Sequence, residues 1–372
     1  MNEDKATRYH RLSRRARVLS IAAGLAALVA LIKGGGPPLM RDAITSWTSA
    51  GASAPSTVAL YALLLVLAYL ALRLPIAFYQ GFLLERRYGL SSETFGAWLG
   101  DYLKAALLVT LLAVGGAEVV YAAMRWSPHW WWIPAALCFS VVLIVLARIA
   151  PVALLPLFYH FEPLERETLR ARLGALSVRA GVPILGAYVW GLGDKTKRAN
   201  AALIGTGSTR RILLSDTLLA NYSDDEIEVI LAHELAHHVH HDIWRGIALE
   251  VALLTLGLFV TDRVLDMSIG HFGLAGKADV AGLPILVLAG GAVSLLLLPL
   301  VNAVSRAHER RADRYALDMT SNADAFISAM KRLGAQNLAE ERPSRIVELL
   351  FHSHPPIAAR LEAARNWHPK RT

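Results

Sequence analysis

A short run of the sequence, HELAH at residues 233–237, combines residue types that can bind a metal ion and activate water. On a helix, His233 and His237 are four residues apart and therefore lie on one face, a turn apart. Both imidazoles can then bind one Zn²⁺, while Glu234 projects about 100° around the axis toward a metal-bound water. Zn²⁺ lowers the pKa of such a water to about 7, so a carboxylate can take its proton and direct hydroxide at a carbonyl. A pentapeptide of this kind also arises by coincidence, so the other ligands have to be found.

A catalytic zinc needs three protein ligands and one open position. The sequence next to HELAH does not supply the third. A third His six residues after the second would stand at position 243, which is Ile243. Glu250 lies about 20 Å further along if the helix continues, because each residue rises 1.5 Å. His238, His240 and His241 face other directions or lie beyond the first turn, and we interpret them as surface or interface residues.

A better candidate follows the next pair of hydrophobic stretches, in NAVSRAHERRAD at 302–313. Glu309 and Asp313 are four residues apart and share a helical face. Glu309 can complete a His₂Glu site, and Asp313 can accept the second ring N–H of a ligand His and so fix its tautomer. The alternative is that Glu309 is a solvated charge among three neighbouring arginines. Spacing alone does not decide between the two.

The composition excludes an ordinary soluble enzyme, since 55% of the residues are hydrophobic and only 18% are charged. Long uncharged stretches predict six membrane spans. These lie at about 18–32, 57–79, 105–124, 131–158, 243–261 and 283–303. The first is short and follows a basic segment, a pattern also found in cleaved signal peptides. No A-x-A cleavage site follows it before residue 34, which favours an uncleaved anchor.

The net charge of +8 is interpreted as a signal of membrane orientation, and nucleic acid is not expected as a partner. Six basic residues within positions 1–17 place the N-terminus in the cytoplasm by the positive-inside rule. Six spans then place 80–104, 159–242 and the C-terminus on the cytoplasmic side, and the 262–282 loop outside. The zinc motif is thus predicted at the cytoplasmic membrane face. The Ala-, Leu- and Arg-rich composition indicates a prokaryote, whose inner membrane would hold the chain.

Other residues constrain the site less directly. Cys138 is the only cysteine and lies in a predicted span, so a metal would have to be held by His and carboxylates.

The tryptophans at 126–132 predict an interfacial aromatic belt, with stacking on a substrate as the alternative. Ionisable side chains within or near the spans either pair between helices or line a hydrated chamber. They are Arg73, Glu118, Arg148, Arg245 and Glu250.

Two regions are polar enough to fold in water. Residues 159–242 contain a helix-like stretch at 162–180 and β-prone runs at 187–191, 200–205 and 211–215, and residues 304–372 have the pattern of helices. Ser223 and Glu226 predict a capping box at the start of the motif helix. Because no proline intervenes, this helix is expected to run unbroken past Asp242 into the span at 243–261.

The predicted fold is therefore mainly α: a polytopic membrane protein of about six spans with a small α+β, zincin-like cytoplasmic domain. Residues 1–158 form an N-terminal membrane domain with four spans. Residues 159–372 form a zinc metallopeptidase domain that includes the two further spans and a cytoplasmic C-terminal segment.

Several motifs together resemble those of the type I CAAX prenyl protease family of integral-membrane zinc proteases. They are HELAH, N-x-x-S-R-x-x-E-x-x-A-D at 302–313, and SHPP at 353–356 followed by Arg360. Segments at 74–104, 149–158, 198–205 and 211–219 are also similar to parts of that family, so the resemblance covers most of the chain from about residue 74. Eukaryotic members carry seven spans, whereas six are predicted here.

The resemblance implies a role for each matching residue. His233, His237 and Glu309 would be the ligands of one Zn²⁺, with Glu234 as general base and Asp313 as a partner of a ligand His.

Further roles are implied outside the zinc ligands. His354 and Arg360 would line the cleft and hydrogen-bond the substrate carbonyl or its developing oxyanion. Asn302 would contribute to substrate binding. Asn200 lies in a run that resembles an edge strand, which would hold an extended peptide by β-addition.

The function expected from all this is a zinc-dependent endopeptidase that cleaves peptide or membrane-protein substrates, lipidated or not, near the cytoplasmic membrane face. A quality-control metalloprotease that degrades misfolded membrane proteins shares the HExxH and later SRxxExxAD elements and is the alternative. A non-proteolytic scaffold or transporter would explain the spans and their charges but has no need for Glu234.

Overall fold

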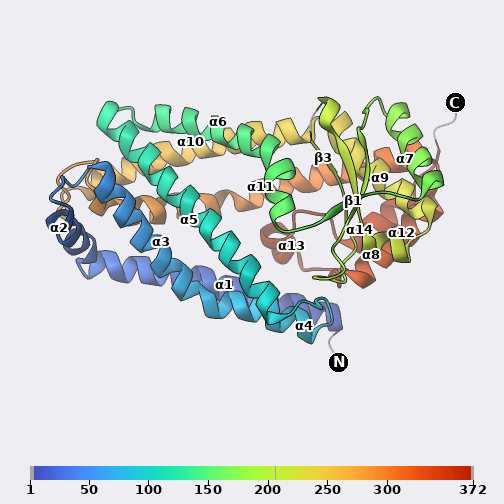
Figure 1. Cartoon of the computed structure of the whole chain (residues 1–372), viewed down its shortest axis with the longest axis horizontal. Helices are drawn as coiled ribbons and strands as arrows, with labels where there is room; N and C mark the ends of the chain where they lie inside the picture. The colour runs from blue at the N-terminus through green and yellow to red at the C-terminus, as the bar shows by residue number, and fades with distance from the viewer. Residues whose placement is uncertain (1–3, 206, 370–372) are drawn as a thin grey trace.

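Long apolar helices make up most of the chain in the computed structural model, which describes residues 4–205 and 207–369 (Figure 1). Among these residues, six helical segments are long and apolar enough to cross a membrane. They are Lys5–Lys33, Pro55–Arg87, Phe95–Trp126, Trp132–Leu157, Asp242–Ser268 and Val280–Thr320. Each contains one of the six stretches expected from hydropathy, except that the stretch expected at 131–158 is one residue longer at each end than Trp132–Leu157. The prediction of a mainly α, polytopic membrane fold is confirmed.

The helices of the membrane part are mostly long, apart from the short α2 and α4. They are α1 (Lys5–Lys33), α2 (Gly36–Thr48), α3 (Pro55–Phe78), α4 (Glu85–Arg87), α5 (Phe95–Trp126), α6 (Trp132–Ile149), α10 (Asp242–Ser268) and α11 (Leu283–Thr320). Two π-helical turns, Tyr79–Leu84 and Ala150–Leu154, continue α3 and α6. Each follows or contains a proline (Pro75 and Pro151) whose missing N–H interrupts the helical hydrogen-bond ladder.

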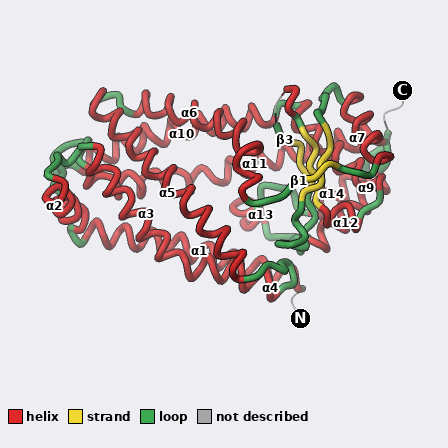
Figure 2. The backbone as a smooth tube through the Cα atoms, viewed as in Figure 1, coloured by secondary structure: helices red, strands yellow, loops and turns green. Residues whose placement is uncertain are grey.

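A small sheet lies at the end of the molecule away from α2, where Figure 2 shows its strands in yellow. Its strands are β1 (Phe161–Pro163), β2 (Gly186–Trp190), β3 (Ala201–Ile204) and β4 (Arg211–Ser215), in the spatial order β1-β2-β4-β3. β2 and β4 are parallel and the other pairs are antiparallel. The strand order places β1 and β3 at the two edges of the sheet. The helix expected over 162–180 begins only at Glu167, because residues 161–163 pair with β2 as strand β1.

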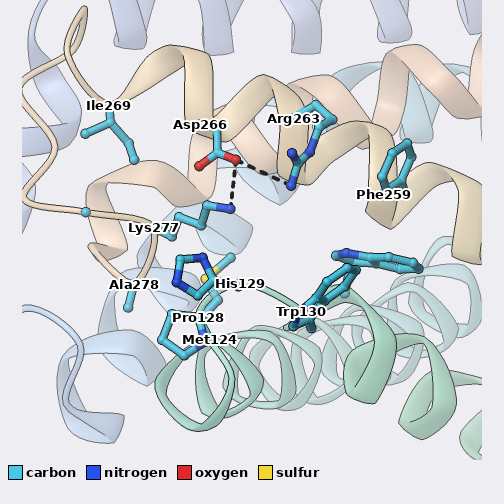
Figure 3. Close-up of a pocket in the computed structure, with 12 residues that line it drawn as sticks. Met124, Pro128, His129, Trp130, Phe259, Arg263, Asp266, Ile269, Lys277 and Ala278 are labelled. Carbon is cyan, nitrogen blue, oxygen red and sulfur yellow. Dashed lines mark ion pairs between the residues drawn. The ribbon is translucent and has the colours of Figure 1, made fainter.

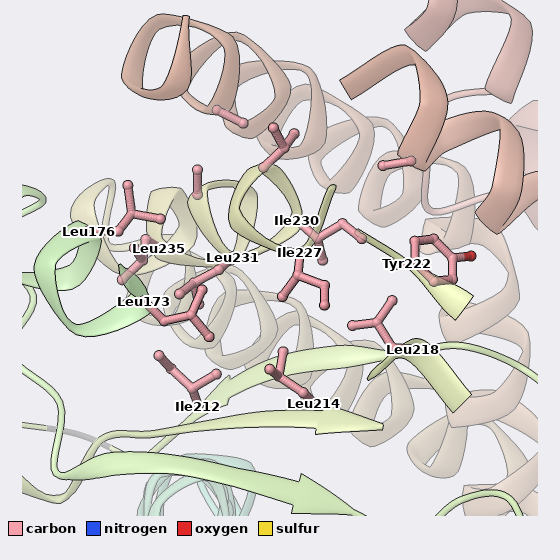
Figure 4. Close-up of a cluster of buried hydrophobic side chains, with 14 of the residues drawn as sticks. Leu173, Leu176, Ile212, Leu214, Leu218, Tyr222, Ile227, Ile230, Leu231 and Leu235 are labelled. Atoms are coloured by element: carbon pink, nitrogen blue, oxygen red, sulfur yellow. The ribbon is translucent and has the colours of Figure 1, made fainter. Parts of the chain in front are cut away.

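Shorter helices surround this sheet. They are α7 (Glu167–Arg179), α8 (Asp216–Asn221), α9 (Asp224–Val239), α12 (Ala323–Gln336), α13 (Arg345–Phe351) and α14 (Ile357–Arg365). The core lies between the sheet and α9, where Ile212 and Leu214 of β4 face Ile227 and Leu231 (Figure 4). All four side chains are fully buried, which anchors α9 to the sheet through the hydrophobic effect.

One expectation about the motif helix is wrong. α9 ends at Val239 and α10 begins at Asp242, so the helix does not run unbroken into the span. His241 has φ 56°, in the left-handed region, and this stops the α-helical ladder. Histidine tolerates that region better than most residues. The break brings the buried carboxylate of Asp242 against the side chains of His237 and Arg311.

Candidate metal centre

The helix α9 presents the HELAH side chains from a well-defined start. The Ser223 side chain accepts a hydrogen bond from the Glu226 backbone, and the Glu226 carboxylate accepts one from the Ser223 N–H, which is the capping box expected from the sequence. The helix then packs on the sheet with one face and along α11 with another. His233 is buried between these elements, and His237 lies one turn later at the more open end.

Three potential ligand side chains meet between α9 and α11. One nitrogen each of His233 and His237 and one carboxylate oxygen of Glu309 all lie within 4.8 Å of one another. The Nε2 atom of His233 is 3.3 Å from Glu309 Oε2, and that of His237 is 3.5 Å from Glu309 Oε1. Ligand atoms at about 2.0–2.1 Å from a tetrahedral Zn²⁺ stand roughly 3.4 Å apart, so the donor types and their separation fit such an ion.

The second ring nitrogen of each histidine contacts a buried aspartate. His233 Nδ1 is 2.9 Å from Asp313 Oδ1, and His237 Nδ1 is 3.0 Å from Asp242 Oδ2. A carboxylate on Nδ1 favours the tautomer that carries its proton there and leaves Nε2 free to bind a metal. Each aspartate is in turn held by an arginine: Asp313 by Arg360, whose Nε is 2.8 Å away, and Asp242 by Arg311.

These contacts decide the electrostatics of the site. Burial alone would lower the pKa of His233, but its hydrogen bonds with Asp313 and Glu309 outweigh this and raise the pKa to about 9. Burial raises the pKa of Glu234 above its ordinary value, against the two neighbouring histidines. A metal ion would therefore have to displace a tightly held proton from His233, so metal binding should weaken in acid.

The side chain of His354 lies at the solvent-facing edge of this cluster. Its Nδ1 is 2.7 Å from Glu309 Oε2, and the side chain is 64% exposed. Arg360, expected to line the cleft, is nearly buried, with its guanidinium bonded to Asp313 and its Nη2 3.5 Å from His233 Nδ1. The contacts of Arg360 in the structure are thus with the support of a ligand histidine.

The two asparagines lie further out. The Asn302 side chain donates to the carbonyl of Leu349, at 3.1 Å, and so connects α11 to α13. It precedes Glu309 by seven residues, roughly 10 Å along α11. Asn200 is exposed at the start of the edge strand β3, where its backbone pairs with Ser215. β3 lies beside α9, and the Nε2 atom of His238 is 3.1 Å from its Leu203 carbonyl.

Two side chains of the site, Asp242 and Arg311, are not predicted from the sequence. On an unbroken helix Asp242 would be five residues from His237, about 140° around the axis, and could not face it. Only the left-handed backbone at His241 brings them together. The acidic residue so close to HELAH is the one signal in the sequence that could have suggested this contact.

A helical membrane protein that gathers two imidazoles of an HExxH helix and a carboxylate from a second helix belongs to the class of membrane-embedded metallopeptidases by its fold and site. The model of peptidase family M48 matches residues 163–368, and the chain belongs to this family. A second family model, described as CAAX prenyl protease N-terminal with five membrane helices, matches residues 2–160. Four helices of that described part are long and apolar enough to cross a membrane.

Individual relatives agree with this assignment. The chain is 29% identical over 288 residues to the uncharacterized metalloprotease YhfN of Bacillus subtilis (strain 168), covering 76% of this chain and 68% of that protein. It is 28% identical over 294 residues to a CAAX prenyl protease 1 homolog of Oryza sativa subsp. japonica, covering 78% and 69%. The crystal structure of S. mikatae Ste24p has the same fold, with a TM-score of 0.86 and 22% identity over 98% of this chain and 88% of that one.

The chain is therefore an integral, multi-pass membrane metalloprotease, and the resemblance to CAAX prenyl proteases is confirmed. These relatives do not favour the quality-control alternative, and a non-proteolytic scaffold or transporter finds no support among them.

Proposed function

We propose that the chain is a zinc-dependent endopeptidase that cleaves peptide or membrane-protein substrates at the cytoplasmic membrane face. The observation that carries the proposal is the meeting of His233, His237 and Glu309 within 4.8 Å, with Glu234 on the same helix as the two histidines. In this proposal residues 1–158 form the membrane domain, and residues 159–372 form the metallopeptidase domain with two spans of its own. The N-terminus and the metal centre are cytoplasmic.

In this mechanism three residues bind the metal ion and a fourth transfers protons. His233, His237 and Glu309 hold one Zn²⁺, which when bound supplies a Lewis acid that polarises a carbonyl and acidifies water. Glu234 takes the proton of the attacking water and later passes it to the leaving amine.

The surrounding residues position these groups. Asp313 and Asp242 fix the tautomers of the two ligand histidines, and Arg360 acts through Asp313 as a positioning residue. His354 is exposed beside Glu309 and can donate a hydrogen bond to the oxygen of the scissile carbonyl as negative charge develops there.

We propose that the substrate is an extended peptide aligned along the edge strand β3. The unpaired backbone of an edge strand can add a further strand, and β3 lies against the helix that carries HELAH. Asn200, at the start of β3, would contact the peptide. Asn302 would contribute to substrate binding, and its side chain also bonds to the Leu349 carbonyl of α13. The name of the Oryza sativa relative, CAAX prenyl protease 1 homolog, supports a C-terminal lipidated peptide as one substrate class.

The test uses the purified full-length chain in lipid nanodiscs. Wild type and Glu234→Gln are compared on fluorogenic peptides with and without a prenylated cysteine, with bound zinc measured in the same samples. Loss of a general base should lower kcat by about 10²–10⁴-fold while the zinc content stays unchanged. Glu228→Gln, on the same helix but paired with Arg172 away from the site, is the control and should cleave normally. Equal cleavage by wild type and Glu234→Gln would exclude the mechanism.

A further inference from the structure

A cavity of about 770 Å³ lies far from the metal centre. Its walls come from the connection between α5 and α6 and from the last turns of α10 with the loop that follows. α10 begins at Asp242, beside His237, and Arg263 and Asp266 of the cavity lie more than 20 residues later, which is roughly 30 Å along the helix. Figure 1 shows the α5–α6 connection at the end of the molecule away from the sheet.

This cavity stands where three spans meet the edge of the bilayer. The span Phe95–Trp126 ends here, Trp132–Leu157 begins here, and Asp242–Ser268 ends here. The side chains of Trp126 and Trp130 are 80% and 61% exposed, as is usual for tryptophans at the level of lipid headgroups. A molecule in the cavity would therefore be in the headgroup layer opposite the metal centre.

Arg263, Asp266 and Lys277 form one wall of the cavity, and the buried carboxylate of Asp262 lies behind them, so the cluster has two acidic and two basic side chains. Asp262 is fully buried and accepts hydrogen bonds from Lys277, at 2.7 Å, from Arg263 and from the indole of Trp131, also at 2.7 Å. Asp266 Oδ2 is 2.8 Å from Lys277 Nζ and 3.5 Å from Arg263 Nη2 (Figure 3). These pairs satisfy Asp262 and Lys277 within the protein.

The pairing leaves one donor edge and one acceptor at the surface of the cluster. Among the described residues, no hydrogen bond involves Nη1 of Arg263 or Oδ1 of Asp266, whereas Nε and Nη2 of Arg263 bond to Asp262. Their side chains are 53% and 38% exposed. The cavity therefore offers a guanidinium and a carboxylate side by side, with no net charge.

Aromatic rings form the other wall. Figure 3 shows His129 and Trp130 across the cavity from Asp266 and Lys277, with Phe259 beside Arg263. Phe259 and Trp132 pack edge to face at 5.3 Å. Rings in this position can cover the glycerol and upper acyl region of a lipid whose headgroup reaches the charged wall.

We propose that this cavity binds the zwitterionic headgroup of an ethanolamine phospholipid. The phosphate would accept from Arg263, and the ammonium would donate to Asp266. An anionic headgroup would bring negative charge toward Asp262 and Asp266 without offering them a cation. A choline headgroup cannot donate a hydrogen bond from its nitrogen to Asp266, which favours ethanolamine. The cavity volume lies within the range of ordinary ligand sites, about 300–1,000 Å³.

Native mass spectrometry of the full-length chain in detergent can test this proposal, with titration of short-chain ethanolamine, choline and glycerol phospholipids and of free phosphoethanolamine. We expect the ethanolamine lipid to bind most tightly. Asp266→Asn should weaken its binding about tenfold, since a charge-assisted hydrogen bond is worth about that factor. Trp130→Ala should weaken it by a similar factor, because it removes a ring that would cover the glycerol and upper acyl region. Trp130→Ala keeps the ion cluster intact, so it tests the cavity even if Asp266→Asn unfolds. Arg125→Gln is the control, because Arg125 lies at the same border but bonds to the Ser53 carbonyl.

Equal binding of all three lipids, binding that neither cavity variant weakens, or free phosphoethanolamine binding as tightly as the lipid would each overturn the proposal. The experiment measures lipid binding and does not depend on proteolysis, so its result tests the lipid site independently of the proposed peptidase function.

Discussion

The two candidate ligand histidines are held in the same way from opposite sides. Each places its Nδ1 on a buried aspartate, and each aspartate is fixed by an arginine. The two series of contacts are His233–Asp313–Arg360 and His237–Asp242–Arg311. Partners of this kind orient the imidazole and raise its basicity, and losing one typically costs a factor of 10–100 in metal affinity.

We expect Asp242→Asn to weaken zinc binding by about 10–100-fold, because the neutral amide holds the His237 N–H less firmly than a carboxylate. Competition with a chromogenic chelator measures the affinity, and the spectrum of the Co²⁺-loaded protein reports the ligand geometry. The matched control is Asp225→Asn, on α9 but half exposed and paired with Arg172. An unchanged affinity and an unchanged cobalt spectrum in Asp242→Asn would show that Asp242 does not position His237.

The sequence predicts which side chains of the site lie together only where they share one continuous helix. The separation of Glu309 from Asp313 fits one helix face, and both lie on the unbroken helix α11, so their shared direction follows from the sequence alone. Asp242 is different. Its contact with His237 depends on one backbone torsion at His241, and no pattern of residue types specifies that torsion.

Among the helices, the junction between α9 and α10 has the largest consequence for the site. Two helices meet there through His241, whose side chain is exposed and whose φ is 56°. A non-glycine residue in this region costs about 1–2 kcal/mol, and a β-branched residue tolerates it least. The contact of Asp242 with Arg311 and His237 offsets that cost.

Replacing His241 with valine should therefore lower the free energy of unfolding by about 1–2 kcal/mol and weaken metal binding, because the break can no longer hold Asp242 in place. His241→Gly is the matched control: glycine adopts this conformation freely, so stability and metal affinity should be kept. Thermal unfolding in detergent and the chelator competition give both quantities. If valine and glycine behave alike, the left-handed backbone is not what places Asp242.

A second junction joins the C-terminal segment to the start of α1. His352 lies here, and burial lowers its pKa below the ordinary 6.5 although nearby Glu340 would raise it. Its other charged or titratable neighbours are His10, Arg14 and Glu348. Because the folded pKa lies below the unfolded one, the unfolded chain binds more protons between the two values. The contribution of His352 to stability is thus lost as the pH falls below about 6.5.

We expect His352→Gln to reduce the loss of thermal stability between pH 7.5 and pH 5.5, since glutamine does not titrate. Unfolding midpoints of the full-length chain at both pH values measure this. His368→Gln, an exposed histidine near the C-terminus, is the control and should follow wild type. A pH dependence that is the same in all three proteins would mean that the burial of His352 does not contribute to it.

The elements themselves differ in how far the sequence predicts them. The spans are predictable because each is a long apolar run, and length and hydropathy settle the matter without tertiary contacts. β1 is not, because its three residues, Phe161–Pro163, are a strand only through pairing with β2. The end of α9 at Val239 is not predictable either, because the helical pattern of the sequence continues past it.

For the molecule as a whole, α11 connects the membrane part to two of the site's carboxylates, and α10 connects it to Asp242. α11 is a single helix of 38 residues that starts in the span and carries Glu309 and Asp313 on its second half. The start of α1 adds a further connection, since Arg14 pairs with Glu340 and the Nε2 atom of His10 is 2.7 Å from the Leu338 carbonyl. The segment that carries His354 is therefore held from the membrane side as well.

This arrangement predicts that the metal stabilises the whole chain, because a bound ion would tie α9 to α11 and hence the sheet region to the membrane helices. Zinc at 100 times its Kd should add about 2.7 kcal/mol to the free energy of unfolding, if the unfolded chain does not bind it. Removing zinc with a chelator should accordingly lower the unfolding midpoint, measured by intrinsic fluorescence, and excess zinc should restore it. The Glu309→Gln variant should contain less zinc, and the chelator should change its unfolding midpoint little. In Glu234→Gln the chelator should lower the midpoint as much as in wild type. If Glu309→Gln keeps its zinc and shows the full shift, Glu309 is not a ligand and the metal does not link these helices.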